Sequence, residues 1–162
     1  MSDASGLLAA LQPVLDRIAA LDLTQPEAAR AALDLDLPMS GPVLREVRAR
    51  VEAGLAEGWL CPRQNGEIAF GRVAKASTTA QELGIDAVHM HGPGPGHLHP
   101  DGEVDLCFDL DGSPTFDGRA PGWTVYPPGS WHVPTVAGGD MIILYFLPGG
   151  AITFGPRPDG AT

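Results

Sequence analysis

The chain has 162 residues, of which 44% are hydrophobic and 19% charged, and its formal net charge is −10. A chain of this length and composition folds as one globular domain and is not intrinsically disordered. Because so acidic a surface repels the phosphate backbone, we expect no nucleic-acid partner, and an anionic substrate needs a local cation.

The sequence indicates a cytoplasmic protein. Cys61 and Cys107 form no CxxC spacing, which is typical of two reduced thiols. The first residues, MSDASGLLAALQP, lack a basic segment, so we expect no signal peptide. The longest apolar run, residues 141–147, is too short to cross a bilayer, and no membrane partner is expected.

Residues 1–58 are predicted to form a helical segment. Leucine, valine and isoleucine recur at helical spacing from Leu7 to Ile18, although Pro13 must start or kink a helix there. The tetrapeptide at 24–27, Thr-Gln-Pro-Glu, is a capping-box pattern, and Ser-Gly-Pro at 40–42 begins a further amphipathic helix.

These helices have two interpretations. Followed by a β-wing at 59–70, they could form a winged DNA-binding unit. However, residues 1–60 contain five arginines against nine acidic residues, and no basic face emerges. Helices packed on a β-barrel or at a subunit contact are the favoured interpretation.

From about residue 59 the pattern changes to short strands. Strands are predicted at 66–76, 85–91, 103–109, 123–126, 141–147 and 151–154, with a hairpin turn at Asp111-Gly112. The 21 glycines and 16 prolines supply many turns. Many short strands separated by such turns predict a mainly β barrel or jelly roll at 59–156, followed by a loose tail at 157–162.

Four of the five histidines lie in one segment, HMHGPGPGHLHPDGE, at 89–103. His97 and His99 alternate along an extended strand, so they project from one face about one pleat repeat apart. Glu103 follows after a short turn, and His132 lies in a second Pro/Gly-rich segment. Three imidazoles and one carboxylate suit a borderline divalent metal and leave coordination positions open, as catalysis requires.

These residues match the two motifs of the cupin superfamily. The first is His97-x-His99, three residues and Glu103, with Gly112 after it; the second is Gly122 followed by Pro127-x-Gly129-x-x-His132. The chain departs from the family at Val136, where cupins often have asparagine, a position that is usually not a ligand. The resemblance implies a cupin-type double-stranded β-helix barrel in which His97, His99, Glu103 and His132 hold one metal ion.

The whole chain also resembles a narrower family, the 4-hydroxylaminobenzoate lyases, which join N-terminal helices to a single cupin barrel. The runs HLHPDGEVDLCFDLDG and GWTVYPPGSWHVPTVAGGDMIILYFLPGGAI carry this resemblance. It implies an ammonia-releasing lyase of aromatic degradation that converts 4-hydroxylaminobenzoate, or a related hydroxylamino-aromatic acid, to protocatechuate. Iron is the first expectation for the metal, while zinc, manganese, nickel and cobalt accept the same ligands.

Under this resemblance, other residues gain expected roles. His89 and His91 share a strand face with Ile85 and Ala87, and if that face looks into the barrel both can transfer protons; otherwise their role is structural. Arg72, Lys75 and Arg119 are the barrel cations available to a substrate carboxylate. The aromatic side chains that could line the substrate site, or simply belong to the core, are Trp123, Tyr126 and Trp131.

Two other functional classes remain open. The same ligands could serve an Fe(II) cupin dioxygenase or isomerase of a small aromatic or organic acid. A non-catalytic cupin that binds a metal or small molecule is the third possibility.

The strand at 103–109 raises a question of covering. If Glu103 points inward, strict alternation also points Asp105 and Cys107 inward and leaves Val104, Leu106 and Phe108 as an apolar strip outside. The helices or a second subunit could cover this strip, or a bulge could reset the register. We favour covering and expect a homodimer.

Overall fold

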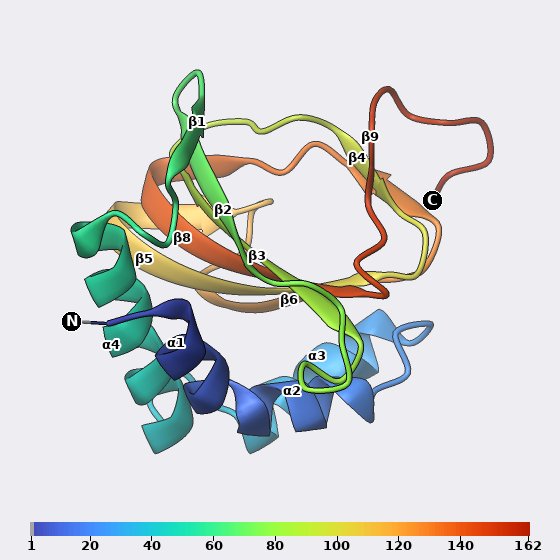
Figure 1. Ribbon diagram of the computed structural model, residues 1–162. Helices are drawn as coiled ribbons and strands as arrows, with labels where there is room; N and C mark the ends of the chain where they lie inside the picture. Colours follow the sequence, from blue (N-terminus) through green and yellow to red (C-terminus); the bar gives the residue numbers. More distant parts are fainter. Residues whose placement is uncertain (1) are drawn as a thin grey trace.

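The computed structural model describes residues 2–162 and contains an N-terminal helical segment and a β-barrel (Figure 1). The mainly β fold with helices at its N-terminus confirms the prediction. No helix within these residues is long and apolar enough to cross a membrane. The helices are α1 (Ala4–Ala10), α2 (Gln12–Ala19), α3 (Pro26–Asp36) and α4 (Pro42–Glu57). The strands are β1 (Arg63–Asn65), β2 (Ile68–Ala74), β3 (Leu83–Met90), β4 (His97–His99), β5 (Glu103–Phe116), β6 (Gly122–Tyr126), β7 (Ser130–His132), β8 (Val136–Pro148) and β9 (Thr153–Phe154).

Prolines begin the helices as predicted, and a glycine ends the last helix. Pro13 lies in the first turn of α2, and Pro26 and Pro42 begin α3 and α4, where a missing N–H costs nothing. Gly58 ends α4 in the left-handed conformation, with φ of 85°. The predicted capping box is wrong, because Gln25 precedes α3 without a side-chain cap and the Thr24 hydroxyl donates to Asp22 instead.

Two antiparallel sheets form the barrel. The larger has the strand order β1-β2-β3-β8-β5-β6, and the smaller has the order β7-β4-β9. The smaller sheet lies on one side of the larger sheet and the helices lie on the other (Figure 1). Because β1 and β2 extend the large sheet, they are part of the barrel and not a separate wing, which removes the winged interpretation.

Alternation along β5 divides the core into two clusters. Val104, Leu106 and Phe108 are at most 1% exposed and belong to the cluster that contains the helix leucines. Cys107, on the opposite face, belongs to the cluster inside the barrel. The helices of the same chain therefore cover the apolar strip. A hydrogen bond from the Trp123 indole to the Leu37 carbonyl also links the sheet to the end of α3. The strip no longer gives a reason to expect a dimer.

The hairpin turn predicted at Asp111-Gly112 is wrong. That dipeptide lies inside β5, where the register against β8 shifts, so it is part of an irregular, bulged stretch. The hairpin turn is Asp117-Gly118, with φ of 49° and 82°, and the flanking residues Phe116 and Arg119 exchange two backbone hydrogen bonds. This turn places the Asp117 carboxylate beside the barrel interior.

The C-terminal tail is tied to the barrel and is not loose. The Thr162 carbonyl accepts a hydrogen bond from the Trp131 amide at 3.1 Å, and the Thr162 amide donates to the Gly129 carbonyl at 3.3 Å. The Gly155 amide also donates to the Gly96 carbonyl at 3.0 Å. The prediction failed because these contacts are made by backbone atoms, which the tail sequence GPRPDGAT does not reveal.

Candidate metal centre

Three strands bring four side chains to one point inside the barrel. On β4, His97 and His99 both point inward, and the antiparallel partner β7 sets His132 directly opposite His97. Glu103 is the first residue of β5, reached through the turn at Gly102, whose φ is 91°. Metal-ligating atoms of the four residues all lie within 4.8 Å of one another. The residue set predicted from the sequence is therefore assembled.

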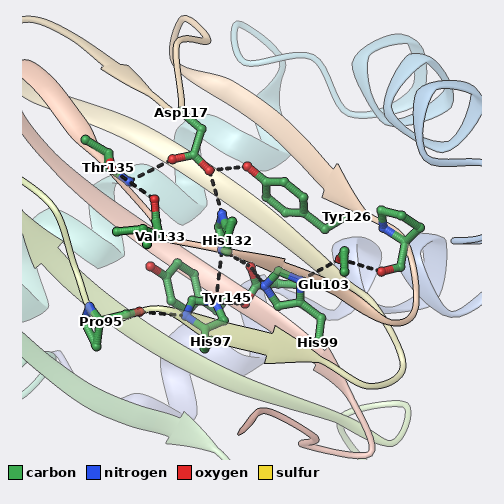
Figure 2. Close-up of polar contacts among 12 residues, drawn as sticks. Pro95, His97, His99, Glu103, Asp117, Tyr126, His132, Val133, Thr135 and Tyr145 are labelled. Carbon is green, nitrogen blue, oxygen red and sulfur yellow. Dashed lines mark hydrogen bonds and ion pairs between the residues drawn. The ribbon is translucent and has the colours of Figure 1, made fainter. Parts of the chain in front are cut away.

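The distances within this cluster are short (Figure 2). Nε2 of His97 lies 3.1 Å from Nε2 of His132, and Nε2 of His99 lies 3.0 Å from Oε2 of Glu103. The other two rings lie 3.5 and 3.6 Å from the Glu103 carboxylate through their Nε2 atoms. His99 and Glu103 are fully buried, and His132 is the most exposed member at 11%. The Nε2 atoms of all three rings converge on the carboxylate.

The outer nitrogen of each ring determines its tautomer. Nδ1 of His97 lies 3.1 Å from the Pro95 carbonyl, which can only accept, so this nitrogen carries the proton. Nδ1 of His99 lies 2.9 Å from Oγ of Ser130, which gives its own proton to the Pro127 carbonyl and therefore accepts here.

The third ring follows the same rule. Nδ1 of His132 lies 2.7 Å from the Asp117 carboxylate, which accepts its proton. In the neutral form, each ring therefore presents an Nε2 lone pair to the interior. Such hydrogen bonding by the outer nitrogen is what metal-ligating histidines show in general.

The centre consists of acceptor atoms that face one another. Nε2 of His99 and both carboxylate oxygens of Glu103 are buried without a hydrogen-bond partner within residues 2–162. Lone pairs packed this closely repel unless a cation lies between them. Three imidazole nitrogens and a carboxylate are ligands that suit a borderline divalent ion, so the residues fit a metal.

Asp117 connects the turn after β5 to the centre. Besides its bond to His132, it accepts the Thr135 amide at 2.8 Å and the Tyr126 hydroxyl (Figure 2). Burial raises the pKa of Asp117, but hydrogen bonds from His132 and Tyr126 outweigh burial, and the pKa lies below its ordinary value. The carboxylate therefore stays ionised and holds the His132 ring in place.

Burial and charge also shift the protonation of the ligands. Burial lowers the pKa of His99, while the neighbouring Glu103 carboxylate raises it. Burial outweighs the carboxylate, so the pKa lies below its ordinary value and the ring favours its neutral form. Burial raises the pKa of Glu103, yet the His97 and His99 rings together lower it well below the ordinary value. A neutral imidazole beside an ionised carboxylate is the state that binds a metal.

A row of polar residues crosses the inner face of the large sheet next to the ligands. Register pairs Asp105 with Tyr145 on one side and with Thr124 on the other, and Tyr145 with Asp86. Asp105 is fully buried, and neither of its carboxylate oxygens has a hydrogen-bond partner in the described part of the chain. Burial, followed by the Glu103 charge, raises the pKa of Asp105 well above its ordinary value.

His89 and His91 lie away from this centre, and the premise of their predicted roles was wrong. The face that His89 shares with Ile85 and Ala87 turns outward, because both of those residues belong to the core cluster that contains the helices. His91 follows β3, is 46% exposed, and lies 3.3 Å from Glu67 and 3.4 Å from Asp140.

The residues predicted to bind substrate are divided by the structure. Tyr126 lies in the centre, with its ring stacked 5.2 Å from that of His99. Arg72 reaches the rim of the barrel, pairs across the strands with Asp86, and donates to its carboxylate at 2.7 Å. Lys75 is exposed beyond the end of β2.

The other two aromatic candidates point away from the ligands. Trp131 alternates with Ser130 and His132, so its ring lies on the opposite face, where the indole donates to the Gly155 carbonyl at 3.0 Å. Trp123 belongs to the core under the helices. The third cation, Arg119, pairs with Glu27 on the outside.

Sequence reasoning missed four polar residues around the centre: Asp105, Asp117, Ser130 and Tyr145. Two had a usable signal. Ser130 lies two residues before His132 and so shares its strand face, and Asp117 opens another Asp-Gly dipeptide soon after Asp111-Gly112. Alternation did place Asp105 inward, but without a role. Tyr145 gave no signal within its apolar run.

Solved cupin structures resemble this chain. An RmlC-like cupin from Ralstonia eutropha has a TM-score of 0.42 and 16% identity, with 60% of this chain and 66% of that chain covered. A double-stranded β-helix protein from Klebsiella pneumoniae has a TM-score of 0.41 and 16% identity, with 60% of this chain and 92% of that chain covered.

Curated relatives and a family model agree with each other. A 4-hydroxylaminobenzoate lyase from Pseudomonas putida is 29% identical over 137 residues, which cover 72% of this chain and 76% of the relative. A 4-hydroxylaminobenzoate lyase from a Nocardioides strain is 30% identical over 126 residues, which cover 69% of this chain and 72% of the relative. The family model for PnbB, 4-hydroxylaminobenzoate lyase, matches residues 9–154, which include α2, α3 and α4, both sheets and every candidate ligand. The chain belongs to the 4-hydroxylaminobenzoate lyase family.

Proposed function

We propose that this protein is a metal-dependent lyase that converts 4-hydroxylaminobenzoate, or a related hydroxylamino-aromatic acid, to protocatechuate and ammonia. The observation that carries the proposal is the buried convergence of three Nε2 lone pairs on Glu103 in a member of this family. His97, His99, Glu103 and His132 would hold one divalent ion, for which iron is our first expectation.

The reaction needs water but no external oxidant. The ring loses its carbon–nitrogen bond and one carbon–hydrogen bond and gains two carbon–oxygen bonds, while the nitrogen–oxygen bond of the hydroxylamino group is broken. One water is consumed and one ammonia is released, so the oxidation of the ring is balanced by the reduction of the nitrogen. A bound divalent ion would supply a Lewis acid for the hydroxylamino oxygen and for water.

The chain's own side chains would orient the substrate. The Tyr126 ring provides a flat surface beside the ligands, since it stacks on His99. Arg72 lies on the same inner-face row as Tyr145 and Asp105, two strands away from Tyr145, and its side chain is 51% exposed. A para-substituted benzoate has its carboxylate and nitrogen at opposite ends. We propose that Arg72 binds the carboxylate while the nitrogen end faces the ligands.

The decisive experiment is turnover without oxygen. Purified protein is loaded separately with Fe(II), Mn(II), Zn(II), Ni(II) and Co(II), and 4-hydroxylaminobenzoate is added under anaerobic conditions. We expect ammonia and protocatechuate in equal amounts with at least one metal, and neither with the chelated protein. A strict requirement for oxygen would contradict the lyase and favour a dioxygenase, while retained metal without turnover would favour a binding protein.

A further inference from the structure

Two buried polar groups next to the metal ligands lack a strong hydrogen-bond partner within residues 2–162. Both carboxylate oxygens of Asp105 are buried without a hydrogen bond to any residue in the 2–162 range. The Tyr145 hydroxyl, at 5% residue exposure, has only the Met90 sulfur at 3.9 Å, and a thioether is a weak acceptor. An unpaired buried carboxyl costs stability, so its presence requires an explanation.

The two groups are adjacent and face the centre. Asp105 and Tyr145 are direct register partners on β5 and β8, and the alternation of both strands points them to the inner face. The side chains of such partners are in contact range. Asp105 is two residues from Glu103 on the same face, and the Tyr145 ring lies 6.1 Å from the His97 ring (Figure 2).

The polar layer ends at this pair. The next inward position on β5 is Cys107, which pairs with Ile143 on β8, and both lie in an apolar cluster with Met90 and Met141. The ligands and the Asp105–Tyr145 pair therefore form one polar layer of the barrel interior, and the next layer is apolar. A proton shared between Asp105 and Glu103 would engage one oxygen of Asp105 and leave its other oxygen free as an acceptor.

We infer that Asp105 and Tyr145 form the subsite that hydrogen-bonds the nitrogen-bearing end of the substrate. This inference rests on the proposed function for the identity of the substrate. A hydroxylamino or amino group on an aromatic ring offers N–H donors, which match the free oxygens of Asp105, while the Tyr145 hydroxyl can donate to the hydroxylamino oxygen. A carboxyl group in either protonation state keeps an acceptor oxygen, so the inference requires no particular charge.

Binding of two unreactive analogues tests the subsite. Calorimetry with the metal-loaded protein compares 4-aminobenzoate with 4-methylbenzoate, which has a similar size but no donors. We expect the wild type to prefer the amine about tenfold, the magnitude of one such hydrogen bond. In Asp105→Leu we expect the two analogues to bind with about equal affinity. In Tyr145→Phe the preference for the amine persists, because Asp105 still accepts the amine's hydrogen bond. The matched control Cys107→Ala, the next inward residue, keeps the preference.

Metal content and melting temperature provide readouts that do not depend on turnover. All variants are expected to retain the metal, and Asp105→Leu is expected to melt at a higher temperature, because an unpaired buried carboxyl is removed. Asp105→Asn keeps one acceptor and a near-identical shape, so it replaces Asp105→Leu if that variant does not fold, with a reduced preference for the amine. An equal preference in wild type and Asp105 variants, or none in the wild type, overturns the inference.

The two proposals fail in different ways. If wild-type protein releases ammonia from 4-hydroxylaminobenzoate but the analogue preference is insensitive to Asp105, only the subsite is wrong and Asp105 serves Glu103 instead. If the preference depends on Asp105 but no ammonia appears, the subsite stands and the reaction is wrong.

Discussion

The carboxylate of Asp117 accepts the Nδ1 proton of His132 at 2.7 Å, although fifteen positions separate the two residues along the chain. The bond selects the tautomer that presents Nε2 to the metal centre. Partners of this kind typically contribute about 10- to 100-fold to metal affinity. We expect Asp117→Ala to weaken metal binding by this factor, measured by competition with a chromogenic chelator.

Asp111→Ala is the matched control for this prediction. Asp111 also precedes a glycine on β5, but it is exposed and lies outside the centre. Unchanged affinity in Asp117→Ala, or an equal loss in both variants, would contradict the role of the Asp117 bond.

Removal of a ligand should remove the metal and leave the fold. We expect His97→Ala and His132→Ala to contain little metal by elemental analysis while their circular dichroism is unchanged, since β4 and β7 keep their backbone pairing. His91→Ala, a histidine outside the centre, should retain full metal content. Full stoichiometry in both ligand variants would refute the assignment of the site.

Chelation of the wild type gives a complementary result. Because a metal that binds only the folded state stabilises it, removal at a metal concentration 1,000 times the dissociation constant costs about 4 kcal/mol. The melting temperature should fall on addition of chelator and recover on addition of metal.

Local sequence patterns predicted His97 and His99 because the position of both rings depends only on alternation along their own strand. The His-x-His spacing needs only a strand to place both rings on one face, and the strand β4 is present. The helices were predictable for a similar reason, since Pro26, Pro42 and Gly58 act on the backbone of their own residue. The covering of Val104 by these helices followed from the pattern of β5, though the pattern did not choose between helices and a partner subunit.

What the sequence did not reveal depends on contacts between distant segments. The sequence does not decide whether the face of His89 and His91 looks into the barrel, because a strand covered on both faces is apolar on both. The Asp-Gly dipeptides at 111–112 and 117–118 are equally good hairpin signals. Only the long pairing of β5 with β8 selects the second of them as the turn. Thr162 is held by backbone hydrogen bonds, which cannot be predicted from the types of the residues involved.

The packing of the helices against β5 predicts a large loss of stability on truncation. Leu106 is fully buried between the sheet and the helices, so Leu106→Ala should lower the free energy of unfolding by about 2–5 kcal/mol. Leu35, which is 80% exposed on α3, gives the control: Leu35→Ala should stay within about 0.5 kcal/mol. Urea denaturation measures the free energy of unfolding of both variants. Equal losses in the two variants would contradict the contribution of Leu106 to the packing between the helices and β5.

Both thiols should be unreactive in the native protein. Burial raises the pKa of Cys61 to about 11, although the His89 backbone partly opposes it, and burial also raises the pKa of Cys107 well above its ordinary value. The thiolate is the reactive form. At pH 8 we expect a disulfide reagent to modify the native protein slowly and two thiols rapidly in denaturant; fast native reaction of Cys107 would contradict its burial in the barrel.

Acidification should release the metal within a defined pH window. Metal binding requires the Nε2 lone pair of His99, and burial lowers the pKa of this ring from the ordinary 6.5. The pKa of Glu103 is also lowered, from 4.5, so its carboxylate stays ionised while the His99 ring begins to protonate. For groups with a lowered pKa, the folded, metal-competent state is stabilised above the ordinary pKa and loses that stabilisation as the pH falls.

We therefore expect full metal content at pH 8 and progressive loss only below pH 6.5, with protonation of imidazole preceding that of the carboxylate. Dialysis against metal-free buffer from pH 8 to pH 4.5, followed by elemental analysis, measures the release. Asp117→Ala should shift the release toward higher pH, because His132 loses the acceptor that holds its proton on Nδ1 and its Nε2 atom becomes easier to misplace. Metal that stays bound in full at pH 4.5, or a release with the same midpoint in both proteins, would show that the histidines do not hold it.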